Sequence, residues 1–195
     1  MVQQRKRRPP MKLGIIVAST RPTRVGHLVG QWMHERAVEH GKFDIELLDL
    51  AKFHLPLYDE PKHPSLQQYE HDHTKQWSAS VAAADAFVIV TPEYNYGPPP
   101  SLINAFDYVY KEWNYKPAGF VSYGGVSGGL RAVQMEKQTL TTLKVVPIVE
   151  AVVIPMVAQS IADGRFNGNE LQTQAAKVML DELLRWAAAL KTLRG

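Results

Sequence analysis

The chain has 195 residues, of which 45% are hydrophobic, and its formal net charge is +3 at pH 7. This length suffices for one domain with a substantial core, and the absence of any run of about 18 apolar residues excludes a membrane-spanning helix. The sequence contains no cysteine, which excludes disulfides, thiolate nucleophiles and cysteine-ligated metal or iron–sulfur centres and fits a cytoplasmic protein.

The positive charge is concentrated near the N-terminus. The run RKRR at residues 5–8 carries +4, so the rest of the chain carries −1 once these four charges are taken from +3. We interpret residues 1–10 as a disordered basic tail and residues 11–195 as a single domain. A short basic run can contact nucleic acid or anionic lipid, but the domain has no basic stripe, so we expect no nucleic-acid partner and no membrane partner.

Compact apolar runs alternate with helical segments along the chain. KLGIIVAS, at residues 12–19, is typical of a buried parallel strand, and the segment Gly26 to His40, followed by Gly41, predicts a helix with a glycine stop. Residues 51–70 contain three prolines and predict a long loop. The remaining predicted strands lie at 43–50, 86–91, 118–123 and 149–154, and the remaining helices at 72–84, 101–112, from Gly129 to Lys144, and 169–192.

Strands that alternate with helices predict an α/β fold with a parallel sheet between two layers of helices. Five such units in a three-layer, doubly wound sheet, with right-handed crossovers, favour the strand order 2-1-3-4-5. Ligands of such sheets bind at the carboxyl ends of the strands, where the strand order reverses. The loops that follow the first, third and fourth predicted strands are therefore the candidate ligand-binding segments.

The loop after the first strand, STRPTRVG, has the groups that bind phosphate. Ser19, Arg21 and Arg24 supply a hydroxyl and two guanidinium groups, and the N–H groups of Val25 and Gly26 lie at a helix N-terminus. The motifs that bind a nucleoside triphosphate or a dinucleotide pyrophosphate are absent. A mononucleotide phosphate is therefore favoured, and an ordinary capped helix with solvated arginines is the alternative.

The loop after the third strand, PEYNYG, is unusual for a turn because it contains two tyrosines. Tyr94 and Tyr96 offer flat apolar faces that suit a heterocyclic ring, and Asn95 tolerates left-handed backbone geometry. The alternative is a turn whose tyrosines cover the edge of the core.

The loop after the fourth strand, YGGVSGG, begins at Tyr123 and has four glycines. Gly124 and Gly125 allow the backbone to approach a ligand closely, and Ser127 can donate or accept a hydrogen bond. The alternative is a flexible loop before a helix. Because all three loops follow parallel strands, we expect them to meet at one edge of the sheet.

The motifs ASTRPTRVG, TPEYNYGPPPSLINAFDY and SYGGVSGGLRA resemble the NADPH-dependent FMN reductase family of flavodoxin-like proteins, and the resemblance spans residues 12–185. It implies a flavodoxin-like fold, noncovalent FMN, and NADPH or NADH as the electron donor. It also implies ping-pong hydride transfer to a small-molecule electron acceptor such as a quinone, an azo compound or free flavin. The family further implies a homodimer or tetramer.

The resemblance assigns a ligand contact to each of the three loops. It places the phosphate on Ser19, Arg21, Arg24, Val25 and Gly26, the flavin ring on Pro92, Glu93, Tyr94 and Asn95, and the other side of the ring on Tyr123, Gly124, Gly125 and Ser127. No catalytic side chain is expected because the flavin carries the chemistry, and Glu93 is interpreted as structural. The sequence departs from the family where Ala18 replaces the usual glycine and where Ile103 replaces a common lysine.

Three further features of the sequence are a histidine pair, a segment rich in aromatic residues and the apolar side of the last helix. His71 and His73 resemble half a metal site, but we favour a solvated helix start and predict no metal. The aromatic residues of segment 101–115 are too dense to be buried together in one helix and predict a subunit interface. The apolar side of the last helix is predicted to consist of Leu171, Ala175, Val178, Leu183, Leu184 and Ala187.

Two other functions remain open from the sequence. One is an electron carrier like flavodoxin, although such carriers are usually strongly acidic and this domain carries only −1. The other is a regulatory flavoprotein that senses redox state.

Overall fold

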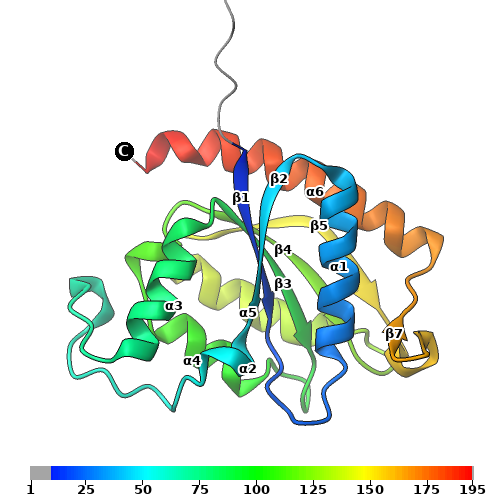
Figure 1. Cartoon of the computed structure of the whole chain (residues 1–195), viewed down its shortest axis with the longest axis horizontal. Helices are drawn as coiled ribbons and strands as arrows, with labels where there is room; N and C mark the ends of the chain where they lie inside the picture. Colours follow the sequence, from blue (N-terminus) through cyan, green and yellow to red (C-terminus); the bar gives the residue numbers. More distant parts are fainter. Residues whose placement is uncertain (1–9, 195) are drawn as a thin grey trace, which may run out of the picture.

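The computed structural model describes residues 10–194, so the predicted basic tail falls almost entirely outside the described residues. Within them, five parallel strands form one sheet in the order β2-β1-β3-β4-β5, which confirms the prediction (Figure 1). The strands are β1 (Met11–Val17), β2 (Phe43–Asp49), β3 (Ala86–Pro92), β4 (Pro117–Tyr123) and β5 (Val146–Ile154).

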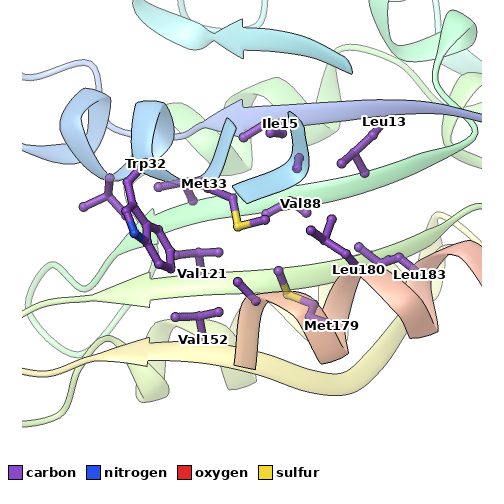
Figure 2. Packing of buried hydrophobic residues seen from close by; sticks show 14 of the residues in the cluster. Leu13, Ile15, Trp32, Met33, Val88, Val121, Val152, Met179, Leu180 and Leu183 are labelled. Atoms are coloured by element: carbon purple, nitrogen blue, oxygen red, sulfur yellow. The ribbon is translucent and has the colours of Figure 1, made fainter. Parts of the chain in front are cut away.

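Helices cover both faces of the sheet. One face packs against α1 (Gly26–His40) and α6 (Glu170–Leu190), and the other against α3 (Asp72–Ala83), α4 (Pro100–Asp107) and α5 (Leu130–Thr142). Figure 2 shows the first of these cores, where Trp32 and Met33 of α1 and Met179 and Leu180 of α6 point toward the strands. The alternation of side chains along each strand supplies apolar residues to both cores.

The helix ends follow the sequence signals. Gly41 adopts a left-handed φ of 72° after α1, and its N–H donates to the carbonyl of Ala37. Asn169 caps α6 in a reciprocal pair with Gln172. The predicted bounds of the main elements are close to those observed, with two exceptions: α4 ends earlier than predicted, and β5 begins earlier than predicted.

The predicted apolar side of α6 is partly wrong. Leu171 is 81% exposed and Val178 is 41% exposed. The buried stripe instead follows helical spacing through Ala176, Met179, Leu180, Leu183 and Ala187. The helix carries apolar residues on more than one side, so the sequence did not show which of these sides faces the sheet.

The aromatic patch on which the predicted subunit interface rests is mostly buried. The helix ends at Asp107, not Glu112, and the chain then turns through a short 3₁₀ helix. Phe106, Tyr108 and Trp113 are fully buried, and the ring of Trp113 packs on Phe106 at 5.5 Å. These rings can all reach the core because Phe106 lies in α4 and Trp113 in the 3₁₀ helix that follows it. The prediction treated the whole segment as one helix, in which such closely spaced aromatic residues would point to several sides.

The predicted loop 51–70 contains a short helix, α2 (Leu50–Phe53), at its start. A small hairpin, β6 (Ile161–Ala162) and β7 (Arg165–Phe166), precedes α6 and was not predicted. Among residues 10–194, no helix combines the length and hydrophobicity needed to cross a bilayer.

The two ends of the described chain lie together at the amino-terminal end of β1. The carboxylate of Asp85 accepts a hydrogen bond from the N–H of Lys12 and pairs with Lys191 and Arg194 near the C-terminus. The loops predicted to bind a ligand lie at the opposite end of the strands (Figure 1).

Candidate functional site

The loops after β1, β3 and β4 meet at the carboxyl edge of the sheet, as predicted. The hydroxyls of Ser19 and Tyr94 are hydrogen-bonded at 2.6 Å. The Ser127 hydroxyl donates to Glu93 at 2.9 Å, and Pro92 pairs with Tyr123 in the sheet register. Every loop therefore contacts at least one of the others directly.

The loop after β1 leaves nitrogen donors free. The guanidinium of Arg24 is held by Asp49 at 2.7 Å, while its Nε is buried and has no partner among the described residues. Helix α1 starts without a side-chain cap and without an acidic residue in its first turn. A helix start of this kind, with the N–H groups of Val25 and Gly26 and an unpartnered arginine nitrogen nearby, offers donors suited to an anion such as a phosphate. Arg21 is exposed beside them.

Gly26 is required by close packing beneath this loop. A Cβ atom at Gly26 would lie 2.4 Å from the hydroxyl of Tyr123. The Tyr123 side chain is only 4% exposed. Burial, together with the neighbouring Tyr94, raises the pKa of Tyr123 above its ordinary value, so the phenol stays protonated. Its side chain thus supports the start of α1 from below.

The segment PEYNYG forms a tight two-residue turn. Tyr94 and Gly97 exchange two backbone hydrogen bonds of 2.9 Å, and Asn95 and Tyr96 both have positive φ, at 49° and 68°. These are features of a type I′ turn, in which tyrosine is an uncommon choice because its Cβ disfavours the left-handed region by about 1 kcal/mol. Tyr96 is 69% exposed, and the guanidinium of Arg131 lies 4.1 Å from its ring centroid.

Glu93 ties this turn to the start of α5. Its carboxylate accepts hydrogen bonds from the Ser127 hydroxyl and from the N–H and guanidinium of Arg131, the last at 2.7 Å. Burial acts to raise the pKa of Glu93, but these hydrogen bonds outweigh it and hold the pKa below its ordinary value. An ionised carboxylate with these partners suits the structural role predicted for Glu93.

The loop after β4 is anchored to the end of β5. The carbonyls of Gly124 and Gly125 accept hydrogen bonds from Val157 and Met156, at 3.1 and 2.8 Å. Gly129 has a φ of 86°, and a Cβ there would lie 2.9 Å from the backbone nitrogen of Tyr123. Gly125 faces open space, so its backbone is accessible to a ligand.

The structure adds residues that the sequence reasoning missed. Asp49 holds Arg24, and Arg131 clamps Glu93. Asp49 ends the neighbouring strand at the same edge, so the strand order could have identified it. The hydroxyl of Ser101, at the start of α4, donates to the carbonyl of Ala18 at 2.6 Å, beside a cavity of about 240 Å³ that Thr20 also lines.

His71 and His73 do not form a metal site in the described structure. Their rings stack at 5.2 Å, and His73 Nε2 lies 3.1 Å from a carboxylate oxygen of Asp59. Within residues 10–194, no cluster of three or more histidine or acidic side chains has a geometry that could hold a metal ion.

This fold is flavodoxin-like, and the three loops meet at the switch point of its sheet, where ligands of such sheets bind. The family model for NADPH-dependent FMN reductases matches residues 11–159. The chain is 38% identical to an NAD(P)H-dependent FMN reductase of Schizosaccharomyces pombe, over 78% of each chain. It is 32% identical to an NAD(P)H-dependent FMN reductase of Nectria sp., over 92% of this chain and 89% of the relative.

A solved structure has the same fold. The flavoenzyme NAD(P)H:(acceptor) oxidoreductase FerB from Paracoccus denitrificans superposes with a TM-score of 0.72 at 23% identity, over 92% of this chain and 98% of that one. The chain belongs to the NADPH-dependent FMN reductase family. It is an oxidoreductase that uses FMN as its cofactor and NAD(P)H as its electron donor.

Proposed function

We propose that the protein reduces a small molecule, such as a quinone, an azo compound or free flavin, by a ping-pong cycle. The chemistry would be that of bound FMN, which can accept a hydride from NADPH or NADH and pass two electrons on. With a quinone, two electrons and two protons yield the hydroquinone. NAD(P)⁺ leaves before the acceptor enters, so both substrates use the same face of the site.

The direct contacts between the three loops carry this proposal. Ser19, Arg21 and Arg24 and the start of α1 would hold the phosphate, since they combine an orphaned Arg24 Nε with an uncapped helix N-terminus. Residues 92–95 and the segment from Tyr123 to Ser127 would line the ring, largely through backbone groups. Backbone N–H groups aimed at the ring carbonyls would stabilise the negative charge of the reduced state.

Two of the three loops carry exposed apolar side chains. Tyr96 is 69% exposed in the loop after β3, and Val126 is 89% exposed in the loop after β4. Exposed apolar groups on these loops would suit flat substrates that enter and leave in turn. A protein-to-protein electron carrier would instead need a charged docking surface, and the domain carries only −1.

We also propose that the protein is a homodimer or tetramer in the cytoplasm. Phe106, Tyr108 and Trp113 are buried and cannot form its interface, but Tyr96 of the turn and Leu130 and Met135 of α5 are exposed apolar side chains that could contribute to it. Light scattering of the purified protein tests this assembly, and a monomer at micromolar concentration would contradict it.

The test of function is an anaerobic visible spectrum of the protein reconstituted with FMN, taken before and after NADPH. We expect flavin bands that bleach within seconds and return when a quinone is added. Bound flavin that NADPH cannot bleach would instead indicate a carrier or a redox sensor. If no flavin is retained after reconstitution, the assignment of the three loops is overturned.

A further inference from the structure

A buried carboxyl group lies directly beneath the turn at residues 92–97. Glu136, in the middle of α5, is fully buried. Its Oε1 lies 2.6 Å from the hydroxyl of Thr91, and its Oε2 is buried with no partner among the described residues. The same Thr91 hydroxyl lies 3.3 Å from the carbonyl oxygen of Pro92. Glu136 thus reaches the last strand residues before the turn.

Among residues 10–194, no charged group pairs with this carboxyl. β3 presents Thr91 to α5 and β4 presents Ser122, whose buried hydroxyl also has no partner among the described residues. The one titratable residue of β4, Tyr123, belongs to the opposite core. The elements packed against α5 carry two further titratable groups, Asp107 of α4, which is exposed, and Glu150 of β5. Glu93, Tyr94 and Tyr96 lie in the turn, and Arg131 and Lys137 lie on α5 itself.

Burial, and not a neighbouring charge, dominates the titration of Glu136. Burial raises its pKa to about 8, and the hydrogen bond with Thr91 opposes this only in part. The carboxyl group is therefore neutral at pH 7.

The protonation state decides what Thr91 can do. A neutral carboxylic acid can donate its own proton to the Thr91 oxygen, which leaves the Thr91 proton free for the Pro92 carbonyl. A carboxylate only accepts, so it takes the Thr91 proton and removes the donor from Pro92. It also leaves a buried charge without a counter-ion, which favours opening of this region to water.

We propose that Glu136 is a positioning residue: its neutral carboxyl group holds the end of β3 and the following turn in the FMN-binding geometry, and its ionisation weakens FMN binding. The inference rests on the assignment of FMN to this site. Glu136 contacts no ligand itself and acts through Thr91 and Pro92.

The first test compares FMN affinity of the full-length apoprotein and of Glu136→Gln across pH by fluorescence quenching. If only the neutral form holds the turn, the wild-type Kd rises about tenfold at one pH unit above the pKa, relative to Glu136→Gln. Titrations of FMN and of other protein groups are common to both proteins and cancel in this ratio. Parallel pH profiles would overturn the proposal.

Two variants separate charge from hydrogen bonding. Glu136→Leu removes both, so we expect weak FMN binding at all pH values, whereas the glutamine variant keeps the neutral-pH affinity. Glu46→Gln removes an exposed carboxylate of β2 and is the matched control, for which the wild-type pH profile is expected. A wild-type affinity in the leucine variant would contradict the positioning role.

A second readout does not depend on flavin. Infrared spectra of the apoprotein at neutral pH should contain the carbonyl stretch of a protonated carboxylic acid that disappears in Glu136→Gln and on titration above the pKa. Absence of this band would overturn the inference even if FMN binds normally. Failure of FMN binding with the band present would instead count against the flavin site.

Discussion

The turn at residues 92–97 is held from two sides by carboxyl groups in opposite states. On its outer side, Glu93 is ionised and accepts hydrogen bonds from Ser127 and Arg131. On its inner side, Glu136 is buried without a charged partner and is neutral. The two residues have the same side chain, so their surroundings alone set the difference: hydrogen bonds from Ser127 and Arg131 lower the pKa of Glu93, and burial raises that of Glu136. Both carboxyl groups are therefore in the state that holds the turn only at intermediate pH, above the pKa of Glu93 and below the pKa of Glu136.

The largest expected effect is the loss of stability that ionisation of Glu136 causes as the pH rises. The folded-state pKa of Glu136 is raised from 4.5 to about 8, so the native state binds the proton more tightly and stability falls as pH rises through this window. Relative to Glu136→Gln, wild type should lose up to about 4 kcal/mol of unfolding free energy between these values. Urea unfolding at a series of pH values measures this difference, and a constant offset between the two proteins would contradict it.

A charged contact outside the turn provides the next test. Arg24→Lys keeps the charge but lacks the planar fork and the Nε donor, so it cannot contact Asp49 and a phosphate together. We expect FMN affinity to fall by roughly 1.5–2.5 kcal/mol while riboflavin affinity is unchanged. Isothermal titration with both ligands checks this, and equal losses for FMN and riboflavin would show that Arg24 supports the fold and not the phosphate.

The stabilising contribution of Glu93 should be lost at acidic pH, the opposite range from that of Glu136. The lowered pKa of Glu93 means that its contribution is complete above its unfolded pKa and is lost as pH falls through the folded value. Glu93→Gln should destabilise the protein by about 1 kcal/mol at pH 7, and this difference should vanish in acid. Thermal unfolding in neutral and acidic buffers measures it. A difference that persists in acid would mean that charge is not the cause.

The smallest effect concerns Tyr96. Tyr96→Gly relieves the left-handed backbone strain but removes the contact with Arg131. In an Arg131→Met background, where the contact is already absent, we expect the glycine to stabilise by about 0.5–1 kcal/mol. In wild type the gain should be smaller by about 0.5 kcal/mol. A double-mutant cycle in urea measures this coupling, and additive effects would indicate that the Arg131 contact contributes nothing.

The fold and the meeting of the loops could be predicted because they depend on order along the chain. Parallel strands bring Ser19, Tyr94 and Ser127 to one edge whatever their detailed packing. The stripe of α6 and the position of Trp113 could not be predicted, since they depend on which of several apolar sides faces the sheet. The role of Glu136 was also hidden: within LRAVQMEKQTL it reads as a polar helix residue, and only the structure shows that it points into the core.

The position of the chain ends has a practical consequence. Lys12, Asp85 and Arg194 are joined at the amino-terminal end of β1, and the seven residues of β1 span roughly 23 Å to the site. A molecule tethered to an electrode or bead through this end of the described chain would present the loops to the solution. Because residues near positions 12 and 194 are neighbours, they can also be joined by a short linker and new ends opened elsewhere, which would allow a sensor domain to be inserted without interrupting the sheet.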